Sequence, residues 1–338
     1  MKLRRIDDEV NIVWITDIHL SDRPPGRRSD AYREQIFAKL RQVRQICEDN
    51  HAICLVGGDV FHIKAPKSQA NSLSLIRETI EVFSEFPGGC VYGCVGNHDI
   101  QFDRMDTLPH QPLGILMEAG VYRSLNEEPL IIETREEAML DPSFVIQVDT
   151  WDYAEPADTY EALKRSTARP EGIDYRLGIV HASGCSGDTK IFGEQVSMIG
   201  YNQLRKLDYD ILLWGHDHTR TETERCGNVT HINLGSIARA ALSQDEADRP
   251  VSAVLLKFTT EGAKIKEIPL SVVPLEQAFR VEDKRVIDVK DSTSMKAFFS
   301  ELSESVDEIQ SSDPITVIEA LCKADAKLCA HVKEKCNL

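Results

Sequence analysis

Apolar and polar positions alternate along this chain with two different periods. Two segments carry apolar residues at helical spacing among Arg, Lys, Glu and Gln. Residues 29–50 place four of them on one side, namely Ile36, Phe37, Leu40 and Val43. Residues 70–86 repeat this arrangement and end at a Pro-Gly-Gly sequence. The pattern predicts two amphipathic helices, the second stopped by its proline and glycines.

Short apolar runs before, between and after these helices predict strands. Strands that alternate with helices are expected to be parallel, with right-handed crossovers, so the residues that follow them should gather at one edge. After residue 98 the helical period fades, and the remaining runs are mostly strands: 130–134, 144–149, 177–181, 198–201, 211–214, 229–234 and 252–258. Segment 150–175, rich in Asp, Glu and Pro, is predicted to be irregular. The fold class that follows is mixed α/β, with two mixed β-sheets packed as a sandwich between helices.

Composition is that of an ordinary globular protein. The chain has 338 residues with 42% hydrophobic content, enough for one large domain and a smaller attachment. No apolar stretch is long enough to span a bilayer, and the charged residues 1–5 do not lead into an apolar signal core, so we expect no membrane association and a cytoplasmic location. Nine cysteines show no CxxC pairing. In a reducing compartment, buried thiols explain them better than disulfides or zinc.

Metal-ligand residues follow many of the apolar runs. The motifs are Asp17-Ile18-His19, Gly58-Asp59, Asn97-His98-Asp99, His181 and His216-Asp217-His218. Each motif alone is more often a turn or a helix cap, and a lone histidine such as His181 is more often structural. Their conjunction in one chain indicates a two-metal hydrolytic site.

The spacing suggests how two ions would be held. Two ions about 3.5–4 Å apart need an oxygen that both can share, and Asp59, in the middle of the set, is the natural bridge. In an extended segment, side chains two residues apart point the same way. Asp17 and His19 should therefore share a direction, as should His216 and His218. We expect one ion to be held by Asp17, His19, Asp59 and His218, and the other by Asp59, Asn97, His181 and His216. His98 is left over and is a candidate to protonate the leaving oxygen.

In this order, the motifs resemble those of the calcineurin-like metallophosphoesterase superfamily, over roughly residues 10–240. The resemblance implies that Asn97 is a ligand and His98 the acid. The sequence Gly-Gly-Asp-Val-Phe-His, which ends at His62, is most similar to the SbcD-like nuclease subunits of double-strand-break repair complexes. In that family the equivalent histidine helps position the phosphate or nucleotide, which implies the same for His62. The alternative is that His62 only supports a metal ligand.

A loop rich in Pro and Gly follows the first ligands. It carries three arginines, Arg23, Arg27 and Arg28, that could contact phosphates of a substrate. The alternative is a solvated turn that merely starts the helix at Ser29. The sequence does not separate these two interpretations.

A domain boundary is predicted near Val273-Pro274. Residues 1–272 would then form a metallophosphoesterase catalytic domain, and residues 273–338 a small α/β or helical region for capping or partner binding. The last helix should begin with Asp313 as N-cap and Pro314 at its first position. Its apolar residues recur every seven positions. The stripe either binds a partner or packs on its own domain, and its short length slightly favours packing.

The net charge of −16 is unlike that of a stand-alone DNA-binding protein, which usually carries a basic surface. Bound divalent ions would offset part of the deficit. A nuclease with this charge would benefit from a partner that holds the DNA, and the resemblance implies an SbcC-like coiled-coil ATPase subunit. A small phosphorylated substrate fits the charge equally well.

These observations lead to one main hypothesis. The protein would be a two-metal phosphodiesterase of the SbcD-like kind, an exo- or endonuclease that cuts DNA by attack of a metal-bound hydroxide on phosphorus. The resemblance implies manganese, and the ligand set would also accept Fe²⁺, Zn²⁺ or Mg²⁺. The first alternative is a phosphatase or a cyclic-nucleotide or other small-molecule phosphodiesterase on the same scaffold. A non-catalytic binding subunit is a second, against which the intact ligands argue; a homodimer is left open.

Overall fold

The computed structural model describes residues 1–5, 8–25, 28, 31–64, 71–134, 142–166, 168–192, 195–239 and 249–279. Its contacts divide the chain into two units, Met1–Phe279 and Arg280–Leu338. The second unit lies outside the described residues. So do the helix expected from Asp313 and most of the C-terminal region expected from residue 273. The boundary near Val273-Pro274 therefore stays a prediction.

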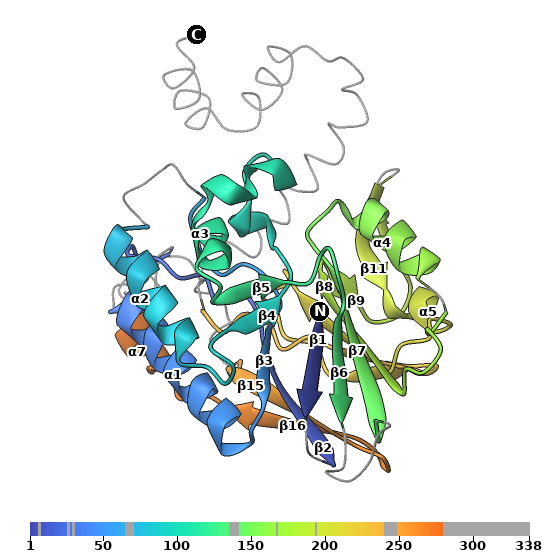
Figure 1. The fold of residues 1–338 in the computed structure, drawn as a ribbon. Helices are drawn as coiled ribbons and strands as arrows, with labels where there is room; N and C mark the ends of the chain where they lie inside the picture. Colours follow the sequence, from blue (N-terminus) through green and yellow to red (C-terminus); the bar gives the residue numbers. More distant parts are fainter. Residues whose placement is uncertain are drawn as a thin grey trace, which may run out of the picture. The chain divides into compact units, whose positions relative to one another are not determined.

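Two large mixed sheets form the centre of the first unit (Figure 1). The first sheet has the strand order β16-β15-β2-β3-β4-β5. Strands β2 to β5 are parallel, and β15 and β16 add an antiparallel hairpin at the β2 edge. The strands are β2 (Glu9–Ile15), β3 (Ile53–Val56), β4 (Val91–Gly93), β5 (Tyr122–Ser124), β15 (Ser252–Thr259) and β16 (Gly262–Pro269).

The second sheet has the order β1-β6-β7-β8-β12-β14-β13. Its central strands β7, β8, β12 and β14 are parallel. The strands are β1 (Lys2–Arg5), β6 (Leu130–Thr134), β7 (Phe144–Trp151), β8 (Tyr175–His181), β12 (Ile211–Gly215), β13 (Glu224–Cys226) and β14 (Val229–Ile232). A small third sheet contains β9 (Gly184–Cys185), β10 (Lys190–Phe192) and β11 (Gln195–Gly200).

Helices cover the outer faces of the two large sheets (Figure 1). On the first sheet they are α1 (Tyr32–Asp49), α2 (Leu73–Ser84) and α3 (Pro112–Glu118). On the second they are α4 (Pro156–Arg165) and α5 (Tyr201–Leu204). The remaining helical turns are η1 (Asn97–Asp99), η2 (Met105–His110) and α7 (Leu275–Ala278). Among the described helices, none is long and apolar enough to cross a membrane.

Strand β2 shows why the sheets stack. Ile12 and Trp14 point into the interior cluster between the sheets, whereas Val13 and Ile15 pack against the helices outside. A strand alternates its side chains between two faces, so a strand that is buried on both faces is apolar throughout. The same logic applies to β3, β8 and β12. The predicted mixed α/β sandwich is confirmed.

The prediction for segment 150–175 is wrong in its middle. Helix α4 occupies Pro156–Arg165, with proline in its first turn. Its buried Leu163 belongs to the cluster beneath the second sheet. Sequence pattern missed it because a ten-residue helix with two buried positions shows too few turns for a 3.6-residue period. Helix α3 and strand β1 were missed for the same reason of length.

Leu163 provides a test of this packing. Leu163→Ala should lower the free energy of unfolding by about 2–4 kcal/mol, because a fully buried leucine leaves a cavity. Urea denaturation would measure it. Glu161→Ala, at an exposed position of the same helix, should change stability by less than about 0.5 kcal/mol. A similarly small effect at Leu163 would contradict the packing of α4.

Candidate metal centre

The seven predicted ligands lie at the carboxyl ends of five strands or in the loops that follow them. Asp17 and His19 follow β2, Asp59 follows β3, and Asn97 begins η1 after β4. His181 ends β8 of the second sheet, and His216 and His218 follow β12. The site therefore lies where the carboxyl ends of both sheets meet. The backbone N–H of His216 donates to the Asp17 carboxylate at 3.2 Å, which ties one sheet's loop to the other.

The first group of donors comes together as predicted from the sequence. Asp17, His19, Asp59 and His218 each offer one ligand atom, and these atoms all lie within 4.8 Å of one another. The Nε2 of His19 lies 3.6 Å from Asp59 Oδ2 and 2.8 Å from His218 Nε2. The Nε2 of His218 lies 3.7 Å from Asp17 Oδ1.

The second group gathers around the Asn97 amide oxygen. That atom lies 3.2 Å from His181 Nε2 and 3.0 Å from His216 Nδ1. His181 Nε2 is also 3.5 Å from Asp59 Oδ1. Asp59 thus directs Oδ2 toward the first group and Oδ1 toward the second. This is the arrangement that a bridging carboxylate requires.

The backbone reaches this arrangement differently from what the sequence suggested. Asp17, His19, Asp59 and His216 have positive φ values of 53°, 50°, 51° and 84°. Each of these residues is therefore in a left-handed conformation, not in an extended segment. The expectation that ligands two apart share a direction because they are extended is wrong in its reason. Left-handed residues other than glycine are strained and cluster at functional sites.

Two glycines allow the loops to approach so closely. Gly58 has a φ of 88°, and a Cβ there would stand 2.6 Å from His181 Nδ1. A Cβ on Gly96 would collide with the Asp59 carboxylate. The glycines of the Gly-Gly-Asp and Gly-Asn-His-Asp motifs are thus required by space at the site as well as by turn geometry.

Hydrogen bonds orient the imidazoles. His181 donates from Nδ1 to the Gly57 carbonyl at 2.6 Å, which leaves Nε2 as the acceptor atom that faces Asp59 and Asn97. His98 donates from Nδ1 to the His62 carbonyl at 2.5 Å, which leaves its Nε2 for chemistry. Such outer contacts fix the tautomer and the ring direction of functional histidines.

Asp99 holds two of the ligand loops together. Its carboxylate accepts hydrogen bonds from the backbone N–H groups of Val60 at 3.0 Å and Gly96 at 3.0 Å. Burial, with a contribution from the charge of Asp59, raises the pKa of Asp99 to about 7. Asp99 is therefore a structural support between the Asp59 and Asn97 loops. The Asn97-His98-Asp99 motif alone does not show whether Asp99 supports the loops or binds a metal.

The carboxylates and imidazoles of the centre are buried close together, and this changes their pKa values. Burial raises the pKa of Asp17 and lowers that of His19 well below its ordinary value. Burial, with the charge of His181, lowers the pKa of His216 to about 4. Burial also acts on His181 and Asp59, but their mutual attraction outweighs it, raising the pKa of the imidazole and lowering that of the carboxyl. Bound cations would compensate such a cluster.

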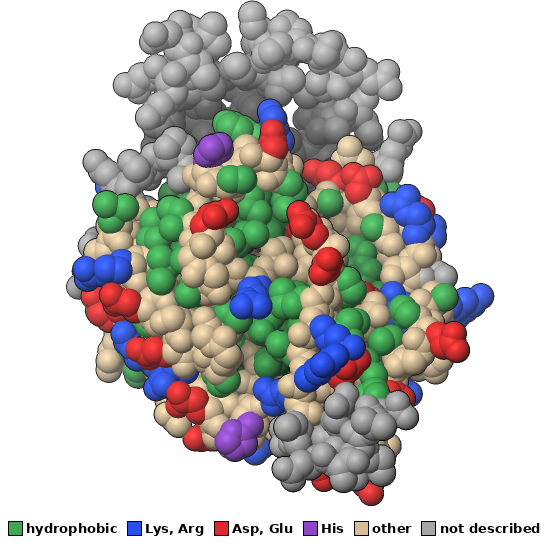
Figure 2. Space-filling view, viewed as in Figure 1, with side chains coloured by type: hydrophobic (Ala, Val, Ile, Leu, Met, Phe, Trp, Pro, Cys, Tyr) green, Lys and Arg blue, Asp and Glu red, His purple; other side chains and the backbone are tan. Residues whose placement is uncertain are grey.

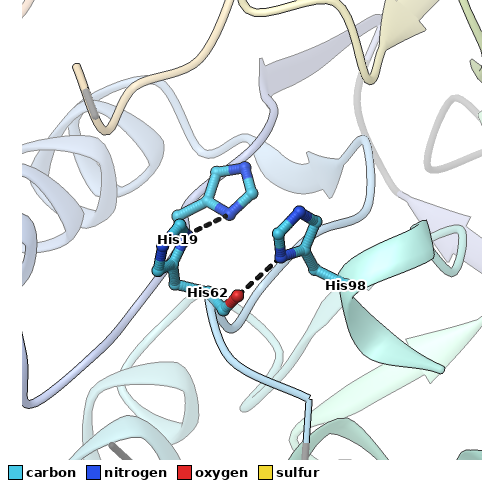
Figure 3. Close-up of side chains that lie close together, drawn as sticks. All are labelled: His19, His62 and His98. Carbon is cyan, nitrogen blue, oxygen red and sulfur yellow. Dashed lines mark hydrogen bonds between the residues drawn. The ribbon is translucent and has the colours of Figure 1, made fainter. Parts of the chain in front are cut away.

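His62 and His98 lie beside the first group (Figure 3). Their rings stack with centroids 5.5 Å apart. The Nδ1 of His62 lies 3.3 Å from the Nδ1 of His19. Burial, followed by the charge of His98, lowers the pKa of His62 to about 4. His62 therefore contacts a predicted ligand and is partly exposed, so the two roles considered for it are compatible.

The three arginines differ from one another. Arg23 is exposed, and Arg27 lies outside the described residues. Arg28 is buried and donates to the carbonyls of Ala238 and Arg239 at 2.8 and 2.9 Å. Its guanidinium also lies over the rings of Tyr32 and Phe279. These contacts argue against a phosphate role for Arg28, and also against a solvated turn: its side chain binds within the fold.

Tyr153 was missed from the sequence. It follows β7, and its ring centroid lies 5.5 Å from that of His216 and 6.2 Å from that of His181. Its backbone N–H donates to the Val95 carbonyl at 2.9 Å, and the neighbouring Asp152 accepts from the Val95 N–H at 2.7 Å. A single tyrosine after a strand carries no motif, so only the paired sheets bring it to the site.

The donor set fits two divalent ions. Ligand atoms about 2.0–2.2 Å from a common ion are no more than about 4.4 Å apart, close to the spread of the first group. Oxygen and imidazole nitrogen together suit divalent transition metals. Bound cations would offset the charge of Asp17 and Asp59 among donors that already lie close together.

Comparison with known proteins decides the family. A profile of the calcineurin-like phosphoesterase family matches residues 10–220, a range that contains all seven residues of the two groups. The chain belongs to the calcineurin-like phosphoesterase family. Members of this family bind two divalent metal ions, and the family indicates a metal-dependent phosphoester hydrolase.

The other comparisons add little to this. The search of curated proteins finds no matching sequence. One solved structure superposes over 78% of this chain and 100% of its own, at 13% identity and a TM-score of 0.43. A similarity of that size carries no argument.

Outside the centre, the described cysteines Cys47, Cys54, Cys90, Cys94, Cys185 and Cys226 are free buried thiols, as expected.

Asp59→Asn should remove most of the bound metal. Asparagine tolerates the left-handed backbone and can still accept from the His98 N–H, but it cannot provide a charged bridge. Elemental analysis of the purified variant would measure this. Asp217→Asn is the matched control, because Asp217 lies between two predicted ligands yet accepts only the nearby Thr219 N–H in the interactions seen. Full metal content in Asp59→Asn would rule out the bridge.

Proposed function

We propose that this phosphoesterase is a nuclease that hydrolyses phosphodiester bonds of DNA, of the SbcD-like kind. The observation that supports this best is the position of His62. It ends the Gly-Gly-Asp-Val-Phe-His motif, its ring stacks on His98, and it is partly exposed next to the first group of ligands. A histidine there has room to contact a phosphate held at the centre.

The ligand groups would hold two ions, manganese by family resemblance, that polarise the phosphoryl oxygens and acidify a water molecule. Asp17, His19, Asp59 and His218 would hold one, and Asp59, Asn97, His181 and His216 the other. Asp17, His19, Asp59 and His181 are fully buried, whereas Asn97, His98, His216 and His218 are partly exposed. The phosphodiester therefore approaches from the side of the partly exposed residues.

His98 is held where it can donate a proton. Its backbone N–H donates to Asp59 Oδ1 at 2.8 Å, and its Nδ1 is fixed by the His62 carbonyl. The remaining Nε2 can give its proton to the departing oxygen of the sugar, which is a poor leaving group without one. His98 is thus fixed in relation to Asp59 while its side chain stays outside both ligand groups.

DNA binding by this chain is expected to need help. On the face in Figure 2, the described Lys and Arg side chains are interspersed with Asp and Glu and form no continuous basic surface. Contacts to phosphates supply most of the affinity of a protein for DNA. We therefore include a partner that holds the DNA, an SbcC-like coiled-coil ATPase or a second copy of this chain, in the proposal. The region from residue 273 is the candidate for capping or partner binding.

A phosphatase or small-molecule phosphodiesterase remains the second candidate, favoured by the net charge of −16. Cleavage of end-labelled linear DNA in the presence of Mn²⁺, compared with hydrolysis of phosphomonoesters and cyclic nucleotides, separates the two. Hydrolysis of small phosphoesters with no DNA cleavage under any divalent metal would reject the nuclease.

His98→Ala should keep both metals and lower the rate on DNA by about 10²–10⁴-fold, the usual contribution of a general acid. The loss should be much smaller on bis(p-nitrophenyl) phosphate, because p-nitrophenolate leaves without a proton. Metal content and rates measured on one preparation provide the test. A parallel fall of metal and rate would make His98 a ligand.

His62→Ala should impair DNA cleavage more than hydrolysis of bis(p-nitrophenyl) phosphate, because a nucleotide must be held in line for attack and an activated ester needs little positioning. The substitution keeps the carbonyl that orients His98. Metal content is the control, since His62 contacts His19. Equal losses on both substrates with less metal would show that His62 acts only through His19.

A further inference from the structure

Phe102 stands at the tip of a tight turn just after the Asn97–Asp99 segment, and its side chain is 83% exposed. Phe102 and Asp103 are the central residues of this turn, with φ values of 53° and 54°. The Arg104 N–H closes the turn on the Gln101 carbonyl at 3.0 Å. Turns with two left-handed central residues usually carry Asn, Asp or Gly there. A phenylalanine in this conformation is strained and gains nothing from burial.

Other contacts fix the turn without using the aromatic ring. The Thr107 hydroxyl accepts from the Gln101 N–H at 2.9 Å and donates to the Arg104 carbonyl at 2.6 Å. The Arg104 guanidinium pairs with Asp106 at 3.0 Å. The fold thus holds an exposed ring in a strained position. Residues in strained conformations that surrounding contacts enforce are concentrated at functional sites.

The turn lies at the edge of the metal centre. Asp103 pairs with Lys64, two residues after His62, at 3.8 Å. The charge of Asp103 also adds to burial in raising the pKa of Tyr153, whose ring centroid lies 5.5 Å from that of His216. Phe102 follows His98 by four residues, so their Cα atoms are at most about 14 Å apart. Phe102 is therefore close enough to contact a nucleotide that lies within a few positions of a phosphate held beside His98.

We propose that Phe102 stacks on an unpaired nucleobase next to the phosphate that is cut. The inference rests on the proposed nuclease function and narrows its substrate to single-stranded or frayed DNA. Stacking on an aromatic ring tolerates every base, because each base has a π face. It requires a base that has left the duplex stack, and an exposed ring on a fixed turn can contact such a base without rearrangement. The chain has a net charge of −16, so a contact that does not depend on attraction to phosphates is more useful to it.

The test uses end-labelled single-stranded oligonucleotides that differ at one position. One carries a natural base, and the other carries a tetrahydrofuran abasic residue, scanned over the nucleotides around the cut. When the abasic residue occupies the position that stacks, the wild-type protein with Mn²⁺ should cut the natural oligonucleotide with a kcat/KM about 5- to 150-fold higher than the abasic one. Phe102→Gly should cut both oligonucleotides at the rate that the wild type shows on the abasic one. Phe102→Tyr, which keeps a ring, should retain the preference.

Phe102→Gly is suited to this test because glycine relieves the strain of a positive φ, so the variant should fold at least as well as the wild type. Its metal content and its rate on bis(p-nitrophenyl) phosphate should be unchanged. A base preference that survives in Phe102→Gly would overturn the inference, as would a wild type that cuts both oligonucleotides equally at every position. A changed oligomeric state in Phe102→Gly with the base preference kept would assign the ring to a protein contact instead. If the wild type hydrolyses small phosphoesters but cuts no DNA, the nuclease proposal itself fails.

Discussion

The structure depends on placing one carboxylate, that of Asp59, in a buried position between two groups of imidazoles. Burial alone would raise the pKa of this carboxyl group, and the neighbouring His181, His19 and His98 hold it below its ordinary value. The His98 backbone N–H adds a direct hydrogen bond. A buried carboxylate is tolerated only with such compensation. The fold supplies it by bringing strand ends of two separate sheets to the same rim.

The cost of this arrangement is concentrated in the ligand loops. Asp17, His19, Asp59 and His216 all have left-handed backbones, each of which costs on the order of 1–3 kcal/mol. The loops are held by groups that take no part in the chemistry, such as the Asp99 carboxylate and the Ser236 hydroxyl, which donates to the Asp17 carbonyl at 2.7 Å. The apolar layers beneath and between the sheets provide the rigidity that keeps these conformations in place.

The centre runs from buried donors to partly exposed side chains. Asp17, His19, Asp59 and His181 are buried, whereas the donors Asn97, His216 and His218 are partly exposed, as are His62 and His98. Tyr153 and the Phe102 turn border the site. Family membership accounts for the presence of metal-binding donors. The chain has a net charge of −16, and on the face in Figure 2 its described Lys and Arg side chains are interspersed with Asp and Glu. Contacts to phosphates would therefore contribute less to the proposed binding of DNA than they do in a basic protein. The contacts proposed for DNA therefore use rings, the imidazole of His62 and the phenyl ring of Phe102.

The sequence by itself determined which residues are candidate ligands and predicted a division of them into two groups. It also predicted the two long helices and the sandwich, because strand ends, helical periods and short motifs are local properties. Tertiary structure decided what local pattern does not contain. It placed Tyr153 against His216, set His62 against His19 and buried Arg28 under Ala238 and Arg239. These contacts join residues far apart in the chain, and their formation depends on how two sheets pack. The left-handed backbones of Asp17, His19, Asp59 and His216 were not predicted either, because the strand and motif pattern does not specify the φ values of the residues that follow a strand.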